Sequence, residues 1–152
     1  MKASSAVTEL RQYGVFYALS GAVTIAVASS NDHPWHGEDQ QRVMVVIAAL
    51  AAICLAMHLV WTLRGLRRAP PAPDFAVTVT WWWTFCRRVV PAAAPTAALG
   101  VYLALLSGLW FVGAFNLVFG AALVFEAMVA WRVERSHGAR VLRFQSRYFL
   151  AH

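Results

Sequence analysis

The stretch that decides the fold runs from Val89 to Trp131 and reads VVPAAAPTAALGVYLALLSGLWFVGAFNLVFGAALVFEAMVAW. It is 43 residues long and carries one charged side chain, Glu126. Because a helix needs about 20 residues to cross about 30 Å of hydrocarbon, this length predicts two membrane crossings joined by a tight turn. We expect the turn between Ser107 and Asn116, where glycines and an asparagine provide turn chemistry.

Two earlier apolar stretches extend this pattern to four crossings. One covers about 13–30, and the other covers 43–63 with His58 as its ionisable group. The whole chain is 60% hydrophobic and 13% charged, whereas soluble domains are about 45–50% apolar and about 25% charged. The sequence therefore predicts an all-α, polytopic integral membrane protein: a four-transmembrane-helix bundle forming a single domain over 1–152. The third and fourth crossings are expected at about 89–108 and about 113–131.

The distribution of basic residues predicts the orientation of this bundle. Twelve of the 13 basic residues precede the first crossing, lie in the connection 64–88, or follow the fourth crossing in the tail 132–152. The loop 31–42 contains only Arg42, together with three acids. Since short basic loops stay in the cytoplasm, both termini are expected to be cytoplasmic. The prevalence of arginine over lysine and the abundant alanine favour a GC-rich bacterium, and hence its inner membrane.

Small residues at four-residue spacing predict how the helices pack. In lipid, close approach of helices depends on such residues rather than on a hydrophobic driving force. We expect one row in each helix, with the bulky faces left for lipid or partners. The rows are Gly14, Ala18, Ala22 and Ala26; Ala48, Ala52 and Ala56; Gly100, Ala104 and Gly108; and Ala122 with Ala130.

The connection 64–88 contains an unusual aromatic cluster. A proline-rich part is followed by the apolar segment from Phe75 to Cys86, which at 12 residues is too short to span. Tryptophans before two arginines are typical of a segment at the headgroup level of the membrane. The alternative is a docking surface for a partner subunit. The residues concerned are Trp81, Trp82, Trp83, Arg87 and Arg88.

The C-terminal tail predicts a basic amphipathic helix. Three arginines, Arg140, Arg143 and Arg147, fall on one helical face, and three apolar residues fall on another. We expect this helix to contact anionic membrane lipids, with an acidic protein partner as the alternative. The apolar residues are Val141, Phe144 and Tyr148.

Two ionisable residues lie inside the predicted spans, where such groups raise a functional question by default. His58 and Glu126 each lie five residues before the cytoplasmic end of their span, so both are expected at one depth. We predict that they approach each other inside the bundle. The alternative is that each binds a separate neighbour. A pair could be a structural clasp or a proton-handling site, and the scarcity of other polar groups favours the clasp.

Metal and cofactor chemistry has weak support in the sequence. His33 and His36 in the loop 31–42 are weak metal candidates without a recognisable ligand spacing, so a solvated acidic loop is favoured. His58 is the one histidine within a predicted span, whereas a transmembrane b-type haem needs two. We predict no cofactor and no metal, and no catalytic motif is evident.

Three functions follow from these observations. The leading one is a non-catalytic integral membrane subunit or accessory protein within a larger inner-membrane assembly. The second is a small oligomeric transporter or channel that uses His58 and Glu126. The third is a haem- or metal-binding membrane anchor for electron transfer. Expected partners are membrane lipids and other membrane subunits or further copies of the chain. The net charge of +6 is interpreted as a topology signal rather than as nucleic-acid binding.

Overall fold

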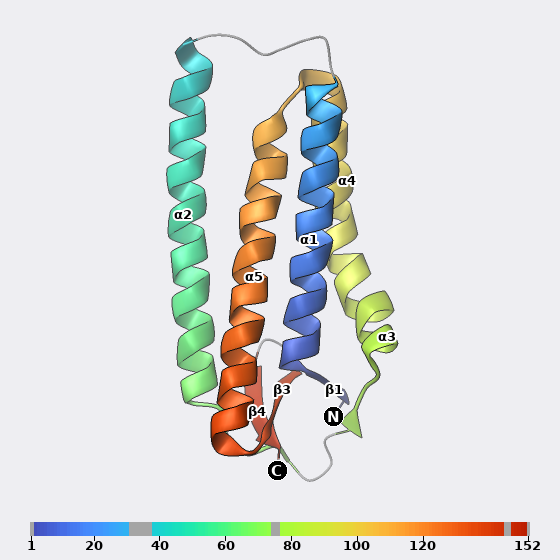
Figure 1. The fold of residues 1–152 in the computed structure, drawn as a ribbon, viewed down its shortest axis with the longest axis vertical. Helices are drawn as coiled ribbons and strands as arrows, with labels where there is room; N and C mark the ends of the chain where they lie inside the picture. The colour runs from blue at the N-terminus through green and yellow to red at the C-terminus, as the bar shows by residue number, and fades with distance from the viewer. Residues whose placement is uncertain (1, 31–37, 74–76, 145–146, 152) are drawn as a thin grey trace.

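The computed structural model describes residues 2–30, 38–73, 77–144 and 147–151 (Figure 1). Long helices run side by side along the molecule, and a small sheet covers one end of them. The elements in chain order are β1 (Lys2–Ser5), α1 (Ala6–Ser29), α2 (Glu38–Arg67), β2 (Val77–Thr78), α3 (Trp81–Thr84), the π-helix η1 (Phe85–Val89), α4 (Val90–Ser107), α5 (Trp110–His137), β3 (Arg140–Phe144) and β4 (Arg147–Ala151).

Within the described chain, three helical runs are long and apolar enough to cross a membrane. They are α1, the continuous run Trp81–Ser107, and α5. These runs indicate a membrane protein. The predicted crossing 43–63 falls within α2, a helix of 30 residues that is not among the three. Four crossings therefore remain a prediction.

The turn between α4 and α5 lies where the apolar stretch predicts it. Gly108 ends α4 with φ 63°, a left-handed conformation that glycine adopts without strain. Its N–H donates to the Ala104 carbonyl at 2.9 Å, and α5 begins at Trp110. The 43-residue stretch thus forms two antiparallel helices, which confirms this part of the prediction.

Backbone contact between α1 and α5 forms the centre of the bundle. A Cβ added at Gly120 would lie 2.6 Å from the Gly14 carbonyl oxygen, and one added at Gly21 would lie 2.5 Å from the Gly113 carbonyl oxygen. The two helices therefore approach as closely as small residues permit. The predicted four-residue row is only partly correct, because the buried face of α1 continues from Gly14 to Gly21 and leaves Ala22 and Ala26 exposed. Helical periodicity of 3.6 residues turns a strict four-residue row away from its neighbour.

The third helical run begins earlier than predicted. Thr80 caps α3, its hydroxyl accepting from the Trp83 N–H at 3.3 Å, so the helix starts at Trp81 rather than near 89. The turn Phe85–Val89 is π-helical, with the Val90 N–H bonded to the Phe85 carbonyl. Pro91 has no N–H to offer the preceding turn, which explains the local change in hydrogen bonding. The tryptophans thus form the first turn of a membrane-length helix.

A four-stranded sheet in the order β2-β1-β3-β4 corrects the all-α prediction. β1 pairs in parallel with β2 and antiparallel with β3, and β3 forms an antiparallel hairpin with β4. The predicted basic amphipathic helix of the tail is therefore wrong. Gly138 does end the preceding helix, at φ 60°, but the short tail that follows pairs with β1 instead of forming an isolated helix. A helix of this length is marginal alone, whereas pairing with β1 satisfies its backbone groups.

Both chain ends lie at the sheet-covered end of the bundle (Figure 1). The start of α1, the last turns of α2 and α5, and the first turn of the Trp81 run gather there as well. This region is the sheet end. Most described arginines belong to elements that meet there, so the sheet end is where charge and polar chemistry concentrate.

Candidate functional site

Two buried carboxylates lie in the half of the bundle nearer the sheet. Glu9 in the first turn of α1 is 5% exposed, and Glu126, 11 residues before the end of α5, is 1% exposed. A buried carboxylate is stable only when hydrogen-bonded or paired with positive charge. The donors around each therefore define the site.

Glu9 joins the sheet to the helices. It accepts from the Ser4 hydroxyl and from Arg88 Nη1 at 2.9 Å, and Arg143 Nη1 lies at 3.5 Å. Arg88 also donates from Nη2 to the Lys2 carbonyl at 3.0 Å. This cluster ties β1, η1 and β3 to α1, because the Glu9 carboxylate contacts one side chain from each of these three elements. The arrangement fits a structural role.

Glu126 connects α5 to α2. Its Oε2 accepts from the Thr62 hydroxyl at 3.3 Å, and its Oε1 lies 3.4 Å from His58 Nε2. The structure thus brings together the two residues that the sequence singles out. Among the described residues, neither His58 Nε2 nor Glu126 Oε1 has a partner with hydrogen-bond geometry, so the contact is close but imperfectly aligned.

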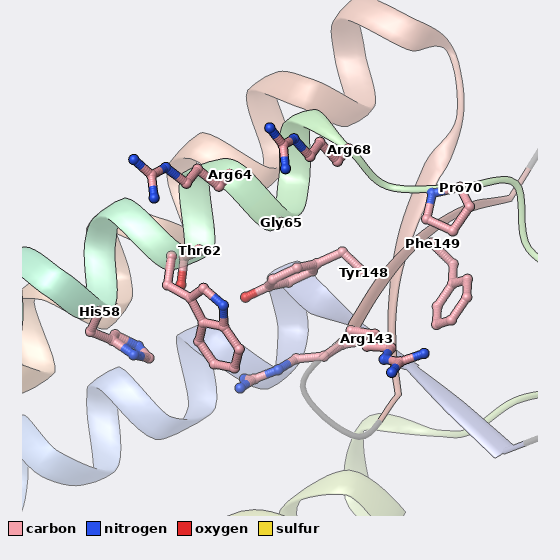
Figure 2. A pocket seen from close by; sticks show the side chains of 11 residues that line it. His58, Thr62, Arg64, Gly65, Arg68, Pro70, Arg143, Tyr148 and Phe149 are labelled. Atoms are coloured by element: carbon pink, nitrogen blue, oxygen red, sulfur yellow. The ribbon is translucent and has the colours of Figure 1, made fainter.

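Tyr148 on β4 is buried against α2. Its hydroxyl points toward Thr62, and its ring packs on Gly65, where an added Cβ would lie 3.0 Å from a ring carbon (Figure 2). Burial raises the pKa of Tyr148 above its usual value near 10, while the neighbouring Arg143 charge and Thr62 act in the opposite direction. The phenol therefore stays neutral and fixes β4 against α2.

A cavity of about 610 Å³ opens between α2 and the β3–β4 hairpin (Figure 2). His58 lies at its inner end, with Glu126 behind it, and the His58 side chain is 30% exposed. Part of the imidazole surface thus faces the cavity while Nε2 is buried beside Glu126, which leaves both a clasp and a proton-handling role open for the pair. Other lining residues include Thr62, Arg64, Arg68, Arg143 and Tyr148.

Some residues of the predicted tryptophan–arginine docking surface are exposed, and others contact the rest of the protein. Trp81 and Trp82 are 60% and 59% exposed, and Arg87 is exposed beside them. Trp83 instead lies beneath Arg88, whose guanidinium carbon is 5.7 Å from the ring centroid. Arg88 is therefore part of the Glu9 cluster rather than free for a partner.

The predicted lipid-contacting arginines divide in the same way. Arg143 turns inward toward Glu9 and Tyr148, with its guanidinium 5.9 Å from the Tyr148 ring centroid. Arg140 and Arg147 remain exposed. The weak metal candidates His33 and His36 lie outside the described residues.

Sequence reasoning missed Glu9, Ser4 and Thr62. The first crossing was predicted at about 13–30, whereas α1 begins at Ala6 and therefore includes Glu9. The available signal was a capping pattern: Ser5 is the N-cap of α1, accepting from the Thr8 N–H at 3.4 Å, and an acid in the first turn suits a helix N-terminus. Thr62 had no distinguishing signal of its own.

These features define a class: a small membrane helix bundle that holds two buried carboxylates in its sheet-proximal half, beside an arginine-lined cavity. In the part of the chain that the structure describes, no group of three or more His, Cys, Asp or Glu side chains could hold a metal ion. Comparison with family models, with curated proteins and with solved structures finds no match to this chain. Its function must therefore be argued from its own geometry.

Proposed function

We propose that this protein is a non-catalytic integral membrane subunit, or accessory protein, that packs within a larger membrane assembly. One observation carries this proposal: α2 exposes its row of small residues. Ala48, Ala52 and Ala56 are all exposed, whereas Gly14 and Gly120 are buried between α1 and α5. Small residues let helices approach closely in lipid, so this row suits a further transmembrane helix.

The surroundings of α2 support the same proposal. α2 packs mainly on α5 and β4, while α1 contacts both α4 and α5 extensively. Around the alanine row, Ile53, Met57 and Trp61 are 56%, 67% and 65% exposed. Exposed large side chains beside a row of small residues are typical of surfaces on which a partner helix packs.

Site-specific photocrosslinking in native membranes tests this proposal. A photoreactive residue at Ala52 should form a stoichiometric protein crosslink, because a partner helix packs there. The same residue at Ala98, which is exposed on α4, is the matched control and should give lipid adducts only. Mass analysis of the product distinguishes a second copy of the chain from another subunit. Lipid adducts alone at both positions would contradict the proposal.

The finer topology is also proposed: four crossings, both termini cytoplasmic, in a bacterial inner membrane. The termini gather at one end of the bundle, as an even number of crossings requires, and the basic residues at that end support a cytoplasmic location (Figure 1). A membrane-impermeant maleimide tests it with single cysteines. Ser29→Cys should label from outside intact cells, and the native, exposed Cys86 only in inverted vesicles. Labelling of both from one side would mean that α2 does not cross.

A transporter or channel is the second candidate, favoured by the cavity that reaches His58. It needs a path beyond Glu126, and the close approach of Gly14 to Gly120 and of Gly21 to Gly113 closes the α1–α5 interface there. A path would therefore have to form between copies, along the exposed face of α2. Proton flux in proteoliposomes that is abolished by His58→Leu would favour this function over the leading one.

A further inference from the structure

The cavity at the sheet end is lined by positive charge, for which the proposed function gives no role. Arg64 and Arg68 line it from the last turns of α2, and Arg143 lines it from the β3–β4 hairpin (Figure 2). Arg147 of the same hairpin also belongs to the lining. None of the described residues that line it is acidic. A concave surface with one sign of charge concentrates ligands of the opposite sign.

Three of these arginines are available to a ligand. Arg143 is held near Glu9 at 3.5 Å, but Arg64, Arg68 and Arg147 form no ion pair with a carboxylate among the described residues. All three are exposed, so their side chains can adjust to a ligand. Arginine presents several N–H donors in a planar fork that matches phosphate oxygens, so the cavity is suited to a phosphate rather than to a simple halide.

The remaining lining has both polar and apolar character. Thr62 and Tyr148 lie at its inner side, whereas Trp61 and Phe149 contribute aromatic surface. Trp61 is 65% exposed at the end of a membrane-length bundle, a position typical of tryptophan at the headgroup level. The cavity thus combines arginines that suit a phosphate with aromatic surface that suits the apolar part of a lipid.

We propose that this arginine-lined cavity binds a phosphate group, carried either by an anionic phospholipid or by a soluble phosphate ester. The volume of about 610 Å³ accommodates a ligand of headgroup size, and the arginines come from two elements distant in sequence. A bound phosphate would therefore also crosslink α2 to the hairpin. The site would exist whether or not α2 packs against a partner, so the two proposals can fail separately.

Native mass spectrometry of the full chain in uncharged detergent tests the lipid source. The probe is short-chain phosphatidylglycerol, and phosphatidylcholine of equal chain length is the neutral lipid control. Wild type should prefer the anionic lipid. R64Q/R68Q should bind it about 30-fold more weakly, since it removes two basic residues that contribute about 1 kcal/mol each. The matched control R87Q/R132Q removes the same charge from exposed positions that do not line the cavity, and it should retain the preference.

Calorimetric titration with glycerol 3-phosphate tests the soluble source. Binding that is lost in R64Q/R68Q and that displaces phosphatidylglycerol supports the phosphate site with a soluble ester as its ligand. Failure of glycerol 3-phosphate to compete, with lipid preference intact, supports the lipid as the source. The proposal is overturned if glycerol 3-phosphate does not bind and R64Q/R68Q changes the lipid preference no more than R87Q/R132Q does.

Two further variants guard against a folding artefact. R64K/R68K keeps the charge but loses the planar fork, so it should retain part of the preference if the arginines bind phosphate directly. R147Q removes an exposed arginine from β4 and should weaken binding independently of any change in α2. Full wild-type preference in R147Q and in R64Q/R68Q together would also overturn the proposal.

Discussion

Glu126 on α5 and His58 on α2 lie side by side in the half of the bundle nearer the sheet, with Oε1 and Nε2 3.4 Å apart. Thr62, one turn after His58, donates to the other carboxylate oxygen at 3.3 Å. A single buried carboxylate thus contacts two positions of α2, a helix that otherwise packs lightly on the bundle. This polar contact is a principal link between α2 and α5.

Loss of His58 should destabilise the protein more than loss of the whole pair. His58→Leu leaves Glu126 buried with Thr62 alone, at a cost of about 1–3 kcal/mol in the free energy of unfolding. The double variant H58L/E126L removes both polar groups and should recover much of that loss. Denaturant unfolding of all four proteins of this double-mutant cycle measures the coupling. Additive effects of the two substitutions would show that the pair does not act as a unit.

Substitution of Arg88 should destabilise the protein more than substitution of its neighbour Arg87. Arg88→Gln leaves Glu9 without its 2.9 Å partner and should cost about 2–4 kcal/mol, less than for a fully buried pair because the Arg88 side chain is 21% exposed. Arg87→Gln is the matched control: the residue is exposed, and the change should stay within about 0.5 kcal/mol. Thermal unfolding in detergent compares them. Equal stability of the two variants would contradict the structural role of the Glu9 cluster.

Methyl groups at the α1–α5 contact should be poorly tolerated. In Gly120→Ala the new Cβ would lie 2.6 Å from the Gly14 carbonyl oxygen and 2.7 Å from the Ala18 nitrogen, both backbone atoms that cannot move independently. The expected loss is about 1–3 kcal/mol or more. In the control, Gly100→Ala, the nearest atoms lie at 3.3 Å and belong to the side chains of Thr24 and Val112, which can shift. A melting temperature for Gly120→Ala as high as that of the control would argue against this interface.

Alkaline pH should loosen the hairpin through Tyr148. Burial raises the pKa of the folded phenol above the unfolded value near 10, so the unfolded chain loses this proton first. Stability is fully retained below pH 10 and falls as the pH rises from there toward the folded pKa. Tyr148→Phe removes the titrating group, and its stability should decline less steeply above pH 10. If the stabilities of wild type and Tyr148→Phe decline equally as the pH rises above 10, the effect is ruled out.

Much of the helical architecture was predictable because its signals are local. The length of the uncharged stretch Val89–Trp131 requires two helices, and Gly108 marks the turn between them. His58 and Glu126 could be paired in advance because 1.5 Å per residue places both at one depth below the same boundary. Hydropathy and helical rise can be evaluated for each segment without knowing which other segments pack against it.

The strand structure of the C-terminal tail could not be predicted, because β3 pairs with β1 at the other end of the chain. The spacing of Arg140, Arg143 and Arg147 fits a helical face, but Leu142 pairs with Ser5 of β1, and the tail forms strands. The same sheet brings Arg143 to Glu9 and Tyr148 to Gly65. Local periodicity cannot reveal such a partner, since strand pairing depends on which backbone lies alongside.

The sequence by itself determined that this chain enters a membrane, where its apolar helices turn, and which two ionisable residues share a depth, because each of these depends on hydrophobic length and helical rise. The tertiary structure alone decided which face of α1 packs, that Arg88 turns inward while Arg87 does not, and that α2 keeps its alanine row exposed. Those outcomes depend on which side chains pair with the few buried charges and which helix faces make close contact. Both are fixed only when the helices and the sheet assemble.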